Sequence, residues 1–195
     1  MRKAEISRNT KETQINLSLN LDGTGCNEIK TGCGFLDHML TLFAAHGRFD
    51  LKINCCGDVY VDYHHTVEDV GICLGQAFYN ALGDKKGINR YGNFILPMDE
   101  ALILTAVDFS GRSYLNWDVN IAAQKVGDFD TELAQEFWLG FVRNSLCTLH
   151  FKQFAGSNAH HIIECAFKSA ARSIAQAVKI NPEYKNEIPS TKGII

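Results

Sequence analysis

Two copies of one short pattern, His-His-x-x-Glu, carry the side chains of this sequence that are best suited to bind metal ions. The copies are His64–Glu68 and His160–Glu164. Residues three or four apart share a helix face, so one histidine of each pair can lie beside its glutamate. Adjacent residues diverge by about 100° around a helix, so the two histidines of a pair cannot easily bind the same ion. The pattern therefore predicts that each motif is divided between two ions.

The ligand types indicate which ions these are. Imidazole together with carboxylate suits first-row divalent cations, and the absence of thiolate from both motifs argues against a closed structural zinc site. The alternative is a pair of histidine-rich helix N-termini without metal. It is disfavoured because the two copies keep both histidines and the glutamate while the residues between them change.

A second group of residues is basic. Arg90, Arg112, Lys168 and Lys192 occur near expected turns or helix faces, and Ser190–Gly193 forms a polar loop around the last of them. Guanidinium, ammonium and hydroxyl groups together could bind a phosphate, although scattered basic residues are more often solvated surface. The sequence contains neither G-x-x-x-x-G-K-[ST] nor G-x-G-x-x-G, so nothing supports nucleotide binding.

Hydrophobic periodicity indicates the elements that must position these side chains. Alternating residues predict strands, apolar residues at helical spacing predict helices, and the last residues, 186–195, have the composition of a loop. The expected strands are 13–21, 49–55, 101–108, 114–119 and 148–154, and the expected helices are 35–45, 66–82, 131–144 and 158–178.

The order of these elements repeats. When the two histidine motifs are aligned, His38 in the first half falls near Glu136 in the second, and each half contains strands, a helix, a strand and a helix. We therefore expect one α+β domain over 1–195, made of two similar halves, about 1–88 and 89–185, with helices packed against β-sheets and a C-terminal tail.

Composition excludes several classes of protein. The chain is 46% hydrophobic and 21% charged with a net charge of −3, which gives no sign of a nucleic-acid or membrane partner. We find neither an apolar run of about 18–20 residues nor a secretory signal in the first ten residues. Seven cysteines, without a C-x-x-C pair, are expected to be reduced thiols in a cytoplasmic protein.

Seven motifs, in this order, resemble the imidazoleglycerol-phosphate dehydratase family over essentially the whole chain. They are Arg8–Thr13, Gly34–Leu40, Asp62–Asp69, Arg90–Gly92, Asp108–Arg112, His160–Glu164 with Phe167–Lys168, and Pro189–Gly193. The resemblance implies a ribosomal protein S5 domain 2-like fold and a homo-oligomer of twenty-four subunits built from trimers. It also implies a hydro-lyase of histidine biosynthesis that dehydrates imidazole glycerol phosphate to imidazole acetol phosphate through metal-stabilised imidazolate and diazafulvene chemistry.

The same resemblance implies roles for individual residues and two Mn²⁺ ions per subunit. One ion would take His38, His65, His160 and Glu164, and the other would take His64, Glu68, His161 and Glu136. Many family members have histidine where this chain has Glu136, so that ligand is a departure. Glu12 is the expected proton-transfer group. The expected substrate contacts are Glu12, His46, Arg90, Arg112, Lys168, Ser190, Thr191 and Lys192, while His150 is expected to be structural.

Two other functions remain open at this point. Two metal ions beside a basic pocket would also suit a phosphatase or another hydrolase, which would release free phosphate. A metal-storage or structural assembly would bind metal without turning over a substrate.

Overall fold

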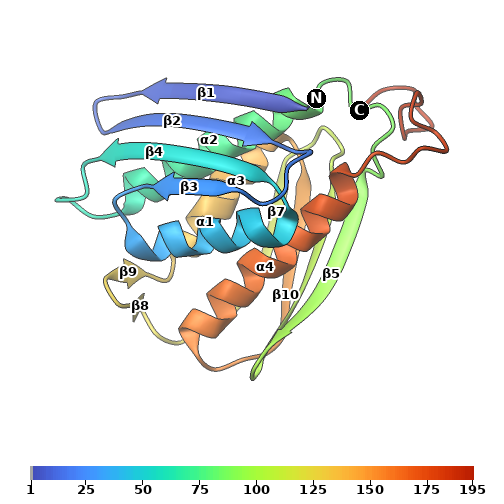
Figure 1. The fold of residues 1–195 in the computed structure, drawn as a ribbon. Helices are drawn as coiled ribbons and strands as arrows, with labels where there is room; N and C mark the ends of the chain where they lie inside the picture. Colours follow the sequence, from blue (N-terminus) through green and yellow to red (C-terminus); the bar gives the residue numbers. More distant parts are fainter. Residues whose placement is uncertain (1) are drawn as a thin grey trace.

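The computed structural model describes residues 2–195 and places four helices between two four-stranded sheets (Figure 1). The first sheet has the order β1-β2-β4-β3, and helices α1 and α2 pack against it. The second has the order β5-β6-β10-β7, and α4 covers β5 and β6 while α3 contacts β7. Between the sheets, α2 packs on α3 and α1 packs on α4.

The elements of the first half are β1 (Lys3–Asn9), β2 (Thr13–Asn20), β3 (Asn27–Lys30), α1 (Gly34–Gly47), β4 (Asp50–Gly57) and α2 (His64–Leu82). Those of the second are β5 (Tyr91–Met98), β6 (Ala101–Asp108), β7 (Tyr114–Asp118), the short pair β8 (Lys125–Val126) and β9 (Phe129–Asp130), α3 (Leu133–Ser145), β10 (Thr148–Ala155) and α4 (Ala159–Val178).

The topology of the two halves is the same apart from β8 and β9. In each sheet the last strand of the order given above, β3 or β7, runs parallel to its neighbour, β4 or β10. The remaining pairs are antiparallel. The equivalence pairs α1 with α3 and α2 with α4. The expectation of an internally duplicated α+β fold is confirmed.

Alternation along the central strands builds the core. On β2, Ile15, Leu17 and Leu19 are buried while Gln14 and Asn16 face outward. These apolar faces meet the helical layer, where Trp138 packs against Phe43, Phe151 and Phe167. These large aromatic side chains hold α3 against α1, against α4 and against the second sheet.

Five strands were not expected from the sequence: β1, β3, β5, β8 and β9. The first three are edge strands, whose outward side is exposed, so burial imposes a weaker pattern on them. Helix α2 begins at His64 rather than Thr66, and α3 begins at Leu133 rather than at residue 131. Helix α1 includes Gly47, and the left-handed residue after it is Arg48.

Two further features bear on the class of protein. Within residues 2–195, no helix is both long and apolar enough to cross a membrane. The seven cysteines are unpaired, and Cys33, Cys73, Cys147 and Cys165 are buried.

Candidate metal centre

Three possible ligands from distant parts of the chain meet where α1 crosses α4. The Nε2 atom of His38 lies 3.3 Å from Oε2 of Glu164, and the Nε2 atom of His160 lies 3.0 Å from the same oxygen. Across residues 2–195, this is the one group of three or more His, Cys, Asp or Glu side chains whose ligand atoms all lie within 4.8 Å of one another. Two imidazoles and a carboxylate thus converge on one point.

The local sequence explains how α4 presents its ligands. The Asn158 side chain caps the helix and accepts hydrogen bonds from the backbone N–H groups of His160 (2.9 Å) and His161 (3.3 Å). The helix therefore begins just before the histidine pair. His160 and Glu164, four residues apart, then share the face that meets His38.

Glu164 is buried, and the basic groups around it favour its ionised form. Burial opposes its ionisation, but the hydrogen bond and charge of Lys168, followed by hydrogen bonds from His160 and His38, outweigh burial and lower the pKa of Glu164. Lys168 lies one turn further along α4 and forms an ion pair with the other carboxylate oxygen. Glu164 is consequently a carboxylate at neutral pH.

The duplication places the corresponding residues where α3 crosses α2. His64 Nε2 lies 4.0 Å from Glu68 Oε2 on α2, and α3 carries the half-buried Glu136. The helices approach closely because of glycines: a Cβ atom on Gly71 would lie 2.4 Å from the carbonyl oxygen of Phe137, the residue after Glu136. In a single copy of the chain, His64, Glu68 and Glu136 do not form a group as tight as that around Glu164.

The second histidine of each motif has a carboxylate partner of its own. His65 Nδ1 lies 3.0 Å from Asp58, and His161 Nδ1 lies 2.8 Å from Glu100. These hydrogen bonds raise the pKa of both histidines, and the bond from His161 lowers the pKa of Glu100 to about 2. A carboxylate on Nδ1 fixes the tautomer and leaves Nε2 free to bind an ion.

Asp58 and Glu100 were missed by the sequence reasoning. Both lie in loops outside the histidine motifs, Asp58 after β4 and Glu100 in the turn between β5 and β6. The signal that could have found them is the acidic character of the turn in each half. Asp58 is seven positions from His65 and Glu100 is 61 from His161, but in neither case does the helix period or the strand alternation indicate which histidine the turn contacts.

His65 and His161 lie outside the cluster around Glu164 within one copy of the chain. Their Nε2 atoms face other carboxylates instead: His65 Nε2 lies 3.7 Å from Glu12 Oε1, and His161 Nε2 lies 3.8 Å from Asp99 Oδ2. The structure thus places Glu12, the expected proton-transfer group, beside the first histidine motif.

The expected phosphate-binding residues divide into two places. Arg90 forms a bidentate ion pair with Asp108 and donates a hydrogen bond to the Pro189 carbonyl (3.0 Å), which brings the C-terminal tail with Ser190, Thr191 and Lys192 to this end of the second sheet. Arg112 follows Gly111, which lies close to Ile195. A Cβ atom added to Gly111 would be 3.1 Å from the backbone carbonyl carbon of Ile195. Lys168 is elsewhere, beside Glu164.

His46, on the last turn of α1, lines a separate cavity of about 500 Å³ with Arg48, Arg172 and Phe94. Burial, and then the charges of Lys168 and Arg172, lower the pKa of His46. His150 is exposed on β10, where it packs on Tyr114 at 5.5 Å between ring centroids.

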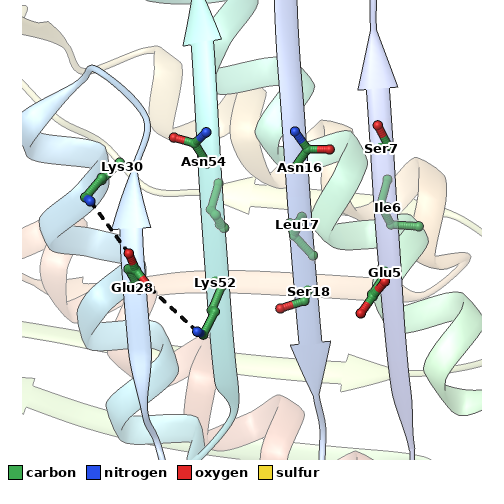
Figure 2. Close-up of a pocket in the computed structure, with 11 residues that line it drawn as sticks. Glu5, Ile6, Ser7, Asn16, Leu17, Ser18, Glu28, Lys30, Lys52 and Asn54 are labelled. Atoms are coloured by element: carbon green, nitrogen blue, oxygen red, sulfur yellow. Dashed lines mark ion pairs between the residues drawn. The ribbon is translucent and has the colours of Figure 1, made fainter.

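The lining of another hollow includes no histidine. It is an open groove of about 640 Å³ on the outer face of the first sheet, lined by rows of polar side chains that include Asn16, Asn54 and the ion-paired Glu28, Lys30 and Lys52 (Figure 2). The candidate ligands lie instead on the helical layer behind that sheet.

Comparisons with known proteins agree on one family. The family model described as imidazoleglycerol-phosphate dehydratase matches residues 31–174. Proteins with that name from Xanthobacter autotrophicus and Gluconacetobacter diazotrophicus are 54% and 53% identical; each match covers 100% of this chain, and 99% and 98% of the relative.

Two solved structures of such proteins are also similar. The protein from Pyrococcus furiosus superposes with a TM-score of 0.85 at 41% identity, over 97% of this chain and 100% of that one. The protein from Staphylococcus aureus gives 0.84 at 40% identity, over 92% and 99%.

Proposed function

This chain belongs to the imidazoleglycerol-phosphate dehydratase family, and we propose that it converts imidazole glycerol phosphate to imidazole acetol phosphate at a metal centre completed between copies of the chain. Membership of this family identifies it as a hydro-lyase of histidine biosynthesis. The observation that carries the proposed site is the convergence of His38, His160 and Glu164 from α1 and α4.

The donor atoms fit divalent metal ions. Two imidazole Nε2 atoms and an ionised carboxylate face one point, and they are ligands that suit first-row divalent ions such as Mn²⁺. We propose two Mn²⁺ ions per subunit: one on this group with His65, the other on His64, Glu68, His161 and Glu136. Bound there, the ions would supply Lewis acidity that makes the imidazole ring of the substrate an electron sink.

A neighbouring copy of the chain would complete each set of ligands. His65 and His161 remain outside the cluster in one copy, yet each has its Nδ1 atom held by a carboxylate, and its Nε2 atom lies near a different carboxylate, Glu12 or Asp99. This arrangement supports a site shared between subunits, and we propose the assembly of twenty-four subunits built from trimers.

Glu12 would move the proton. The hydrogen lost from the substrate is on a carbon next to the one that carries the leaving hydroxyl, so a carboxylate close to the metal ligands is needed to remove it. Glu12 is half exposed and lies 3.7 Å from His65 Nε2, which supports this role. Arg90, Arg112 and the tail residues Ser190, Thr191 and Lys192 would hold the phosphate, with Lys168 and His46 as further contacts.

The direct test is turnover of imidazole glycerol phosphate by metal-free protein to which Mn²⁺ is added in steps, with bound ions counted per subunit. We expect activity to rise as two ions bind and the product to be a phosphorylated ketone. Release of inorganic phosphate would indicate a phosphatase instead. Binding of two ions and assembly without turnover would indicate a storage or structural protein.

A further inference from the structure

Asp69 is a buried carboxylate for which the proposed reaction has no direct use. It follows Glu68 on α2, is 5% exposed, and faces the first sheet rather than the metal ligands. Its two oxygens are bound by different residues: Oδ2 accepts a hydrogen bond from the Thr13 hydroxyl (2.5 Å), and Oδ1 pairs with the Arg8 guanidinium (2.9 Å). A buried charge is costly unless it is paired in this way, so its presence calls for a reason.

The duplication indicates that the fold itself does not require this charge. The position equivalent to Asp69 in the second motif is Cys165, whose thiol donates a hydrogen bond to the Leu96 carbonyl. Helix α4 packs on its sheet without a carboxylate there. The ionic contact is therefore specific to the half of the chain that carries Glu12.

The residues bound by Asp69 are the two ends of the turn that carries Glu12. Arg8 lies near the end of β1, and Thr13 is the first residue of β2. Between them, the Thr10 hydroxyl accepts hydrogen bonds from the backbone N–H groups of Glu12 (3.1 Å) and Thr13 (2.9 Å). The Thr10 N–H group in turn donates to the Thr13 carbonyl (2.9 Å), which closes the turn.

The backbone carbonyl of Glu12 is also hydrogen-bonded to a residue that contacts the histidine motif. The Glu12 carbonyl accepts a hydrogen bond from the N–H group of Asp58 (3.0 Å), the residue whose carboxylate holds His65. Glu12 itself makes no side-chain hydrogen bond among the described residues, and its side chain is 53% exposed. Its position relative to His65 therefore depends on its backbone.

We propose that Asp69 is a positioning residue that fixes Glu12 relative to the metal ligands of α2. Through Thr13 and Arg8 it locks the Glu12 turn to the same helix that carries His64, His65 and Glu68. The role rests on the proposed function of Glu12, because it concerns how that carboxylate reaches the substrate. A misplacement of about 1 Å can lower turnover by about 10²-fold.

The test removes the Thr13 hydroxyl and asks whether the resulting decrease in kcat depends on the Glu12 carboxylate. Thr13→Val keeps the shape of the side chain and the Arg8–Asp69 ion pair, and Thr13→Ser restores the hydroxyl. Thr105→Val is the matched control, because the Thr105 hydroxyl bonds Ser169 (2.6 Å) and so joins a strand to the other motif helix far from Glu12. Each is made in the wild-type and in the Glu12→Gln background.

We expect Thr13→Val to lower kcat by about 10- to 100-fold with KM and bound Mn²⁺ unchanged, and to have no further effect in the Glu12→Gln background. Thr13→Ser and Thr105→Val should stay within about twofold of their parent, a difference too small to signal a lost contact. In metal-free protein, Thr13→Val should speed hydrogen exchange at the amides of Glu12 and Thr13. Asp69→Asn should act in the same direction if it folds.

Three results would overturn the positioning role: an equal loss in the Glu12→Gln background, a loss of bound metal in Thr13→Val, or unchanged amide exchange in the turn. A Glu12→Gln variant with near-wild-type kcat is a different result. It would refute the proposed function of Glu12 itself.

Discussion

Replacing Gly71 by alanine should separate α2 from α3 and weaken one of the two proposed metal sites. The Cβ atom would lie 2.4 Å from the carbonyl oxygen of Phe137, a backbone atom that cannot rotate away. Ordinary packing needs about 3.5 Å between such atoms, so the helices must move apart by roughly 1 Å. Glu136, next to Phe137, would move away from His64 and Glu68 with the rest of α3.

Two opposing energies decide the effect on stability. Alanine is favoured over glycine inside a helix by about 1 kcal/mol, whereas overpacking costs about 1–3 kcal/mol. Because the clash is with backbone, we expect overpacking to dominate and the free energy of unfolding to fall by about 1 kcal/mol. Metal–ligand distances tolerate only about 0.2 Å, so a shift near 1 Å should also cost most of the affinity of the second ion.

The assay is urea unfolding of metal-free protein, with bound Mn²⁺ counted per subunit after reconstitution. The control is Gly34→Ala at the exposed start of α1, where a Cβ atom meets nothing within 4 Å. This control should leave stability unchanged or slightly raised, with both ions bound. A Gly71→Ala protein that is more stable than wild type and still binds two ions would refute the argument.

Four further outcomes are expected. Glu12→Gln should keep its metal and lose about 10²–10⁴-fold in kcat, and a small loss with metal bound would contradict its role. Arg112→Ala and Lys192→Ala should each weaken substrate binding by about 1.5–3 kcal/mol, measured from KM or from competition by inorganic phosphate. If both variants keep the wild-type affinity, the phosphate of the substrate binds elsewhere. Glu136→His should keep two ions and measurable activity, whereas Glu136→Ala should lose about one ion per subunit. If the alanine variant binds two ions and turns over normally, Glu136 is a surface residue. Chelation of the metal should release smaller species, which light scattering would detect. An assembly that stays intact without metal would contradict metal-linked association.

Much of the site follows from local geometry and could be predicted from sequence. The spacing of His160 and Glu164 places both on one helix face whatever the rest of the chain does. The repeat of His-His-x-x-Glu predicted two equivalent halves, and the central strands β2, β4, β6 and β10 were found because one buried face imposes strict alternation on them.

Other features depended on contacts between distant residues. Strands β1, β3 and β5 were missed because an edge strand is defined by its partner more than by its own pattern. The pairing of Asp58 with His65 and of Glu100 with His161 was not expected, because nothing in the local sequence says which turn faces which helix.

The sequence by itself determined the types of the candidate ligands, their helical spacing and the duplication, since each can be read from a short motif or from its recurrence in the second half. Only the tertiary structure decided that His38 meets Glu164 across 126 positions, that His65 stays apart from them in one copy, and that Gly71 lets α3 approach α2. The physical reason is that helix crossings are set by side-chain volume and backbone approach between elements, which local periodicity does not encode.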